Sequence, residues 1–419
     1  MSKLTLVTTA YPYGRSEAAF VEPELACLKE HFEVAILSRN ATDPQTSEVP
    51  VGIRVWRTKR GKAAFLKGIF PALTQKMLYR EFRYIFRHKK EHLFHNLASA
   101  GYFMAMACVV KNSLVAMEKE CGVPDILYTY WNDWSTLGAV WYIQSHNEKT
   151  IRLVTRTHGV DLYEERTPCL YQPYKVQLNQ CLDRIFFISH AGMTYHEMHY
   201  GTALFEDQYQ VRYMGVSADT KVQSTEESEV IRLVSCATMF ELKRLDRIID
   251  ALEYLEEMVA PLGKRVIWTH IGDGPERAFL ERRAQEKLDM LPHIRYIFAG
   301  NLPNEEVHRY YRENQYDLFL SVSRTEGLPV SMQEAIAHGI PVMGTDVGGC
   351  REIIEPDCGV LLDANVVPLH IAEAVMKYME QSYERRMQIR ENCVRQYKEK
   401  FDSKSNYEAF CRELEQLIN

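Results

Sequence analysis

The sequence predicts an α/β protein made of two Rossmann-like, doubly wound parallel-sheet domains that face a central cleft. Short runs rich in β-branched residues alternate with helical stretches of about ten or more residues along most of the chain. These units form two successive series, and the polar segment MGVSADTKVQSTEESEV (214–230) separates them. Because parallel strands need crossover connections, this rhythm favours parallel sheets covered by helices on both faces.

Each series supplies the strands of one sheet. The first series predicts strands over 4–10, 32–38, 124–131, 151–159 and 184–189. The second series predicts strands over 231–237, 266–272, 293–300, 317–323 and 340–345. Ligands of such sheets bind just beyond the carboxyl ends of the strands, so we expect a site that is shared across the cleft.

The polar segment divides the chain near residue 220. We expect an N-terminal domain over 1–218 and a C-terminal domain over 219–395. The highly charged helical stretch 396–419 is expected to form a C-terminal helix that packs back toward the N-terminal domain.

The composition excludes several classes of protein. A net charge of -6 over 419 residues argues against a dedicated nucleic-acid binder. The ten cysteines are scattered from Cys27 to Cys411, without CxxC pairs or zinc-ligand spacing, so we expect a reducing cytoplasm and no disulfide framework. No stretch approaches about 20 uncharged apolar residues, so no membrane span is expected.

The stretch SRTEGLPVSMQEAIAHGIPVMGTDVGG (323–349) places two carboxylates beside the start of a short helix predicted over 329–338. Glu326 lies in the loop after a strand, and Glu334 lies inside the helix. A helix N-terminus attracts phosphate, whereas two carboxylates would accept hydrogen bonds from hydroxyl groups. A nucleotide sugar carries both groups. The alternative is that Glu326 is a solvated loop residue and Glu334 a capping partner.

Two further segments of the second series accompany this stretch. In VSCATMFELKRLDRIIDAL (234–252), Lys243 and Arg244 precede an amphipathic helix, where a lysine suits a diphosphate. In IGDGP (271–275), Gly272 and Gly274 would let the backbone approach a ligand closely. A surface basic pair and a plain tight turn are the respective alternatives.

The first series offers candidate residues at the ends of two strands. In TRTHGVDLYEER (155–166), Arg156, His158 and Asp161 cluster beside a glycine where the cleft is expected. A purely structural histidine is the alternative. After the first strand, the turn TAYPYGRSEAAFVEPEL (9–25) carries Gly14 and Glu17, which would face the second domain. With Arg156 and Asp161, they are our candidates for contact with the acceptor or the diphosphate.

The segment 57–91 is rich in lysine and arginine, interleaved with aromatic residues, in a chain that is acidic overall. This composition suits an anionic membrane surface. The alternative is a solvated helix face whose aromatic residues pack inward. The aromatic residues concerned are Phe65, Phe70, Tyr79, Phe82, Tyr84 and Phe86.

Taken together, these motifs resemble the retaining GT-B glycosyltransferases of family 4. The stretch 323–349 is similar to the Glu-x7-Glu signature of that family, with its flanking EGxP, EAxAxGxPV and GG elements. SCATMFELKRLDRIIDAL, IGDGP, HIRYIFAGNLPNEEVHRYY and RTHGVDLYEER follow the order that the family shows. The resemblance covers almost the whole chain and is strongest from about 231 to 355, since the N-terminal, acceptor-binding domain varies within the family.

The resemblance implies a role for each matching residue. Glu326 would bind hydroxyls of the donor sugar, Glu334 the ribose, and Lys243 the diphosphate. His158 would sit at the reaction centre and Gly14 near the diphosphate or acceptor. Gly272 and Gly274 would line the nucleotide pocket, Gly300 and Asn301 would flank the base, and Gly327 and Leu328 would approach the sugar and diphosphate. Thr238 stands where many members have an arginine that clamps phosphate, and Arg244 would compensate for it.

The implied reaction transfers a sugar from a UDP- or GDP-linked donor to an acceptor hydroxyl with retention of configuration. It needs no cofactor, and we expect no metal, because the chain contains no DxD triplet. The departing diphosphate would help to deprotonate the acceptor.

The implied acceptor is a glycan or a lipid-linked glycan in polysaccharide biosynthesis. We expect a cytoplasmic protein, peripheral on the inner face of the plasma membrane if 57–91 contacts lipid. Two alternatives remain: a nucleotide-sugar 2-epimerase of the same architecture, and a non-catalytic sugar-binding protein.

Overall fold

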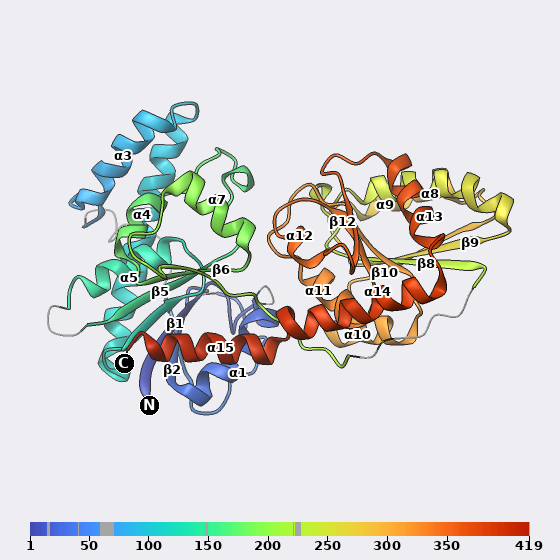
Figure 1. Cartoon of the computed structure of the whole chain (residues 1–419). Coiled ribbons are helices and arrows are strands. Elements are labelled where there is room, and N and C mark those ends of the chain that lie inside the picture. Colours follow the sequence, from blue (N-terminus) through green and yellow to red (C-terminus); the bar gives the residue numbers. More distant parts are fainter. Residues whose placement is uncertain are drawn as a thin grey trace. The chain divides into compact units, whose positions relative to one another are not determined.

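Figure 1 presents the computed structural model of the chain, which describes residues 1–14, 17–40, 42–58, 71–146, 150–220, 222 and 228–418. The chain forms two compact units. Unit 1 comprises Met1–Met214 and Ser403–Asn419, and unit 2 comprises Gly215–Asp402. The sequence predicted these boundaries at 218 and 395. The second boundary lies later in the structure, because the last helix of unit 2 runs on through a π-helical turn, η5 (Tyr397–Phe401).

Unit 1 is built on a seven-stranded sheet of order β3-β2-β1-β4-β5-β6-β7, in which every neighbouring pair is parallel. In register, Leu4 of β1 lies opposite Val34 of β2 and Ile126 of β4. The strands are β1 (Ser2–Thr8), β2 (Phe32–Ser38), β3 (Arg54–Arg57), β4 (Ile126–Thr129), β5 (Arg152–Thr157), β6 (Arg184–Phe187) and β7 (Tyr209–Val211).

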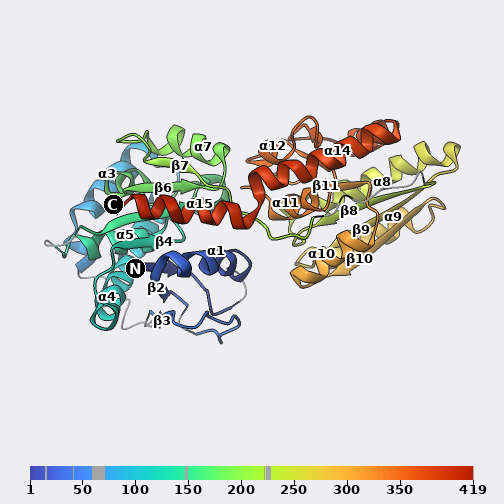
Figure 2. The ribbon, with the colours of Figure 1, turned by 60° about the horizontal axis from the view of Figure 1, so that its bottom comes forward.

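Helices cover both faces of this sheet. On one face, α1 (Ala18–His31) lies beside α15 (Ser403–Gln416), as Figures 1 and 2 show, over a core that includes Leu25, Val34 and Phe410. The other face carries a second core with Met104, Leu127 and Tyr174. The remaining helices of unit 1 are α3 (Lys76–His88), α4 (Leu93–Cys121), α5 (Trp134–Ile143), α6 (Lys175–Leu178) and α7 (His190–Tyr200), with the 3-10 turns η1 (Glu164–Arg166) and η2 (Asn179–Cys181).

Helix α4 is long and apolar enough to cross a membrane by length and composition. One such helix is weak evidence against the expectation of no membrane span, because a buried core helix has the same length and composition. In the structure, 56% of its most apolar window is buried, and α4 packs against α3 and α5. Helix α4 therefore packs as a core helix of an α/β domain, because its apolar residues contact protein rather than lipid.

Unit 2 repeats the arrangement with six parallel strands in the order β10-β9-β8-β11-β12-β13. The strands are β8 (Val230–Cys236), β9 (Arg265–Ile271), β10 (Ile294–Gly300), β11 (Leu318–Ser321), β12 (Val342–Thr345) and β13 (Gly359–Leu362). The helices are α8 (Leu245–Val259), α9 (Arg277–Leu288), α10 (Asn304–Glu313), α11 (Val330–Ala337), α12 (Cys350–Ile353), α13 (Pro368–Met379) and α14 (Tyr383–Gln396), with the 3-10 turns η3 (Glu241–Lys243) and η4 (Ala260–Leu262).

In both units the strand order reverses beside the first strand, between β1 and β4 and between β8 and β11. At such a switch point, the two neighbouring connections leave toward opposite faces of the sheet and open a crevice at the carboxyl edge. The loops that follow β8 and β11 therefore border one crevice, and those that follow β1 and β4 border another.

Candidate functional site

The switch point of unit 2 brings Lys243 and Glu326 together. Lys243 ends the turn η3 after β8, and Glu326 lies in the loop after β11. Lys243 Nζ lies 2.6 Å from Glu326 Oε1, and the two side chains are 22% and 10% exposed. The two groups expected to bind diphosphate and sugar hydroxyls thus form a charge-assisted hydrogen bond to each other.

Backbone packing fixes the loop that carries Glu326. Gly349 N donates to Gly327 O at 2.7 Å. Gly348 has a φ of +51°, and a Cβ there would lie 1.9 Å from Glu326 O, so only glycine fits. Leu328 is buried and anchors the next residue. Gly348 and Gly349 belong to the sequence motif 323–349, but only the structure shows that they hold the loop of Glu326.

Arg244 is not placed to bind phosphate, which corrects the expectation from the sequence. It is buried, with a left-handed φ of 50° at the start of α8. Its guanidinium donates to Val322 O at 2.6 Å, Ser323 O at 2.7 Å and Ala364 O at 2.8 Å. Arg244 thus holds the end of β11 in place, while Thr238, after β8, is exposed.

The glycines of IGDGP contact protein backbone. A Cβ on Gly272 would lie 2.0 Å from Ala237 O, and one on Gly274 would lie 2.7 Å from Met239 O. Gly272 N also donates to Gly300 O at 2.8 Å. These glycines let the loops after β8, β9 and β10 pack together at the carboxyl edge. Asn301 follows with an exposed side chain.

Glu334 lies on the predicted short helix, which the structure confirms as α11. The side chain is buried, and burial raises the pKa of its carboxyl to about 7. Asn304 Nδ2 donates to Glu334 Oε1 at 2.6 Å, which favours the charged form and offsets part of that shift. His308 Nδ1 lies 2.8 Å from His338 Nε2 behind this carboxylate. Glu334 is therefore poised to ionise when further donors reach it.

In unit 1, His158 follows β5 and packs on aromatic rings. Its ring centroid lies 4.4 Å from that of Trp131 and 5.0 Å from that of Tyr130. Burial, followed by the charge of Arg156, lowers the pKa of His158 to about 3, so the ring is neutral near pH 7. His158 Nε2 lies 3.0 Å from Tyr130 O and must therefore carry the proton. Nδ1 remains as a hydrogen-bond acceptor.

Asp161 and Glu17 act on their own loops. Asp161 accepts from His158 N at 2.7 Å and Asn132 N at 2.8 Å, which ties the loops after β5 and β4 together. Glu17 is buried and accepts from Thr9 N at 3.0 Å, two further backbone amides and the Trp131 indole. Both carboxylates are thus occupied by protein donors, and the expectation that Glu17 meets a ligand does not fit this geometry.

Arg156 points away from the carboxyl edge, which corrects its grouping with His158. It lies within β5, on the face of the sheet that α1 and α15 cover, whereas His158 lies in the loop after the strand. Its guanidinium is buried 3.2 Å from Glu24 of α1, over the ring of Phe410 of α15. Arg156 therefore pairs with a buried carboxylate in the core of unit 1.

Gly14 lies in the loop after β1, whose residue Thr9 lines a pocket at the carboxyl edge of unit 1. Gly14 has a φ of 75°, and its amide donates to Pro44 O, which links the loops after β1 and β2. Beyond these loops lies an aromatic pocket of about 430 Å³. Its wall includes Arg39, Tyr102, Phe103, Trp131, Trp134 and Asp161. Arg39 lies 2.7 Å from Asp133 and stacks over Trp134, which gives an apolar pocket with a charged rim.

Comparison with known proteins places these observations in context. Residues 217–396 match the family described as Glycosyl transferases group 1. Curated relatives include the O-antigen biosynthesis glycosyltransferase WbnH of Escherichia coli, 47% identical over 58 residues (14% of this chain and 17% of the relative). The putative colanic acid biosynthesis glycosyltransferase WcaL of the same species is 27% identical over 194 residues (45% of each chain). The matches therefore span from about a sixth to under half of these relatives.

Solved structures show the fold over the whole chain. HepE of Anabaena, in complex with UDP and glucose, aligns with a TM-score of 0.66 at 14% identity over 99% of this chain and 100% of that one. A trehalose-6-phosphate protein from E. coli bound with UDP-2-fluoro glucose aligns with a TM-score of 0.69 at 13% identity over 99% of both chains. The protein thus has the GT-B fold that the sequence predicted.

The raised pKa of Glu334 predicts a pH-dependent effect of Glu334→Gln on stability. A carboxyl whose folded-state pKa is raised destabilises the fold as pH rises from the unfolded value of 4.5 through about 7. Glu334→Gln should therefore stabilise unit 2 by about 3 kcal/mol at pH 8 and by little at pH 5. Urea unfolding at both pH values measures this. Glu241→Gln, on an exposed side chain, is the control, and an equal effect at both pH values would contradict the assignment.

Proposed function

We propose that the protein is a retaining glycosyltransferase of family 4 that transfers a sugar from a nucleoside-diphosphate sugar to a glycan acceptor in polysaccharide biosynthesis. The observation that carries the proposal is the pairing of Lys243 with Glu326 at the switch point of unit 2. The family match over unit 2 and the relatives that act in surface-polysaccharide biosynthesis support it.

In this proposal the donor replaces the Lys243–Glu326 contact. The diphosphate accepts a charge-assisted hydrogen bond from Lys243, and the sugar hydroxyls donate hydrogen bonds to Glu326. The first amides of α11, which follow Pro329, have no intrahelical acceptor and offer a second positive end for phosphate. Glu334 binds the ribose hydroxyls, which favour its ionised form.

Catalysis is then electrostatic. Negative charge develops on the departing diphosphate, and Lys243 with the α11 amides stabilises it without requiring a metal. The leaving phosphate oxygen takes the proton of the acceptor hydroxyl as the new glycosidic bond forms on the same face of the sugar. The neutral His158 serves as a hydrogen-bond acceptor for the sugar through Nδ1, because a group with a pKa of about 3 is too weakly basic for proton abstraction.

The aromatic pocket of unit 1 is our candidate acceptor site. Its volume of about 430 Å³ suits a mono- or disaccharide unit. Flat apolar walls from Tyr102, Phe103 and Trp134 suit the C–H faces of a sugar ring, and Arg39 and Asp133 on the rim suit its hydroxyls.

A lipid-linked acceptor would bring the protein to a membrane, as the composition of 57–91 suggested. Residues 59–70 of this segment, with Phe65 and Phe70, lie outside the described residues. On α3, the inner face buries Leu78, Glu81 and Ile85, while Phe82 and Tyr84 pack partly against the core. The outer face exposes basic and aromatic side chains: Lys76, Tyr79, Arg80, Arg83, Phe86 and Arg87. We propose that this face contacts anionic lipid on the cytoplasmic side.

Exchange of the Lys243–Glu326 contact for donor contacts predicts opposite effects of two variants. Lys243→Ala should weaken binding of UDP or GDP by about 10- to 100-fold, because a charge-assisted contact to phosphate is lost. Glu326→Ala should abolish transfer yet retain nucleoside-diphosphate binding, since it frees Lys243. Calorimetric titration with both nucleotides and their sugars, together with a transfer assay, measures these effects.

Glu241→Ala, which alters an exposed side chain near Lys243, is the matched control and should change neither quantity. If Glu326→Ala lost nucleotide binding and Lys243→Ala retained it, the assignment of Lys243 to the diphosphate and of Glu326 to the sugar would be wrong. If donor alone yields its epimer, the epimerase alternative replaces the transferase.

The acceptor pocket predicts a selective effect of Trp134→Ala. Loss of one aromatic wall should lower kcat/KM for the acceptor about tenfold, the size of a single aromatic contact, and leave donor affinity unchanged. Transfer of labelled sugar to a panel of oligosaccharides measures it. Phe94→Ala, which removes an 87% exposed ring at the start of α4, is the control. Equal loss in both variants would place the acceptor elsewhere.

The outer face of α3 predicts binding to vesicles that contain phosphatidylglycerol at low salt, but not to phosphatidylcholine alone. Replacing Arg80 and Arg83 by glutamate should lower partitioning at least about tenfold, because each basic residue near an anionic surface contributes about 1 kcal/mol. A control variant with Arg309 and Arg385 of unit 2 replaced by glutamate should bind like the parent. Failure of the parent protein to sediment with anionic vesicles would refute the membrane contact.

A further inference from the structure

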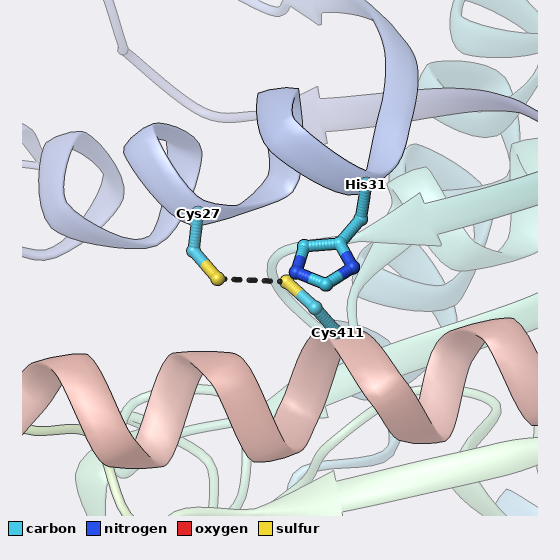
Figure 3. Close-up of side chains that lie close together, drawn as sticks. All are labelled: Cys27, His31 and Cys411. Carbon is cyan, nitrogen blue, oxygen red and sulfur yellow. Dashed lines mark hydrogen bonds between the residues drawn. The ribbon is translucent and has the colours of Figure 1, made fainter. Parts of the chain in front are cut away.

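The first and last helices of unit 1 bring metal-binding side chains together outside the groups discussed so far. Cys27 and His31 are four residues apart on α1, and Cys411 and Glu415 repeat this spacing on α15. Residues four apart share one helix face. Because α1 and α15 pack against each other, the two faces meet. Figure 3 shows both thiols and the imidazole converging between the helices.

The distances match those of a small tetrahedral cation. Cys27 Sγ lies 3.2 Å from Cys411 Sγ, and the donor atoms of Cys27, Cys411 and His31 all lie within 4.8 Å of one another. Tetrahedral Zn²⁺, with Zn–S near 2.3 Å and Zn–N near 2.0 Å, sets its donors roughly 3.3–3.8 Å apart. Side-chain shifts of up to about 1 Å would therefore create the ligand geometry.

Glu415 orients the imidazole. Its Oε1 lies 2.9 Å from His31 Nδ1, so Nδ1 carries the proton and Nε2 is the nitrogen left to bind a metal. A ring nitrogen of His31 lies beside the sulfur of Cys411 in Figure 3. A carboxylate behind a metal-binding histidine is the usual way in which ring orientation and basicity are set.

The surroundings allow entry from one side. Cys411 is fully buried beside Leu28 and Leu414, whereas the side chains of His31 and Glu415 are 27% and 39% exposed. The sulfur end of the group therefore lies in apolar surroundings, and the imidazole end opens to solvent.

We propose that Cys27, His31 and Cys411 bind Zn²⁺, with Glu415 as the positioning residue of His31 and a water as the fourth ligand. The cysteines show no zinc-ligand spacing along the chain, because these ligands come from two helices that are far apart in the sequence. The ion would join α15 to α1 and hold the last helix of unit 1 on the sheet. These residues all belong to unit 1 and none takes part in the proposed transfer, so the proposal is independent of the proposed function.

A disulfide between the same cysteines is the competing use of the pair. The two sulfurs lie 3.2 Å apart, well beyond the roughly 2.05 Å of an S–S bond. The disulfide would also leave the His31–Glu415 pair without a role. Donor chemistry therefore favours the cation, and an intact-mass measurement without reductant distinguishes the two.

The test uses the full chain, stripped with a chelator and dialysed under reducing conditions. Competition with a chromogenic zinc chelator should reveal one tight Zn²⁺ site per chain. Co²⁺ in its place should give a sulfur-to-metal charge-transfer band and the intense visible bands of a tetrahedral ion. Zn²⁺ at about a hundredfold over Kd should raise the Tm by at least about 5 °C.

The variants separate binding from folding. Cys27→Ser, Cys411→Ser and His31→Gln should each lose the tight site, and Glu415→Gln should weaken it by about 10- to 100-fold. Cys121→Ser, which changes a partly buried cysteine outside the cluster, should bind Zn²⁺ like the parent. Circular dichroism of each metal-free variant shows whether it folds.

Three results would overturn the proposal: no Zn²⁺ uptake by the parent beyond weak surface binding, a Co²⁺ spectrum of an octahedral ion, or an intact mass two hydrogens lower that Cys411→Ser restores. The last would assign the pair to a disulfide. The Co²⁺ spectrum of the parent decides the matter even if every variant fails to fold.

Discussion

The contact of backbone with backbone at the carboxyl edge of unit 2 is the constraint on which the candidate donor site depends. Gly348 lies so close to the carbonyl of Glu326 that a methyl group would overlap it, and Gly272 stands in the same relation to Ala237. Arg244 adds three hydrogen bonds to carbonyls from inside. These contacts leave the loops after β8 and β11 little freedom, so Lys243 and Glu326 meet without a ligand. Both side chains are thus held at the site before a donor arrives, and the donor then replaces their contact with each other.

In unit 1, buried carboxylates hold the loops at the carboxyl edge of the sheet together, as close glycine contacts do in unit 2. Glu17 gathers the amides of the loop after β1, and Asp161 joins the loops after β4 and β5. Both are buried acids near the expected site, and residue type alone does not distinguish such groups from ligand-binding ones. Hydrogen-bond partners do: an acid whose oxygens already accept backbone amides serves the fold. Among the described residues, Glu334 accepts one hydrogen bond, from Asn304, with His308 Nε2 4.0 Å away, so it has capacity for a ligand.

The sequence predicted what depends on local pattern. The ten strands with apolar runs, the two series and the short helix of Glu334 are all present. The edge strands β3, β7 and β13 were missed because they have three or four residues and are supported by one neighbour. Arg156 and His158 were grouped by proximity in the chain, but Arg156 lies within β5 and pairs with Glu24 of α1, whereas His158 lies in the loop after the strand. Cys27 and Cys411 could not be paired, because only the packing of α15 on α1 brings distant segments together.

The packing of α15 on α1 also sets the order in which the two units can complete their folding during synthesis. Unit 2 is one continuous stretch, so it can fold as soon as it emerges. Unit 1 begins earlier but lacks the helix that covers Leu25, Val34 and Tyr128 until α15 has been translated, after all of unit 2. Until then, the part of this face that α15 covers beside α1 stays open to water. The half of the chain that is made first is therefore the half that matures last.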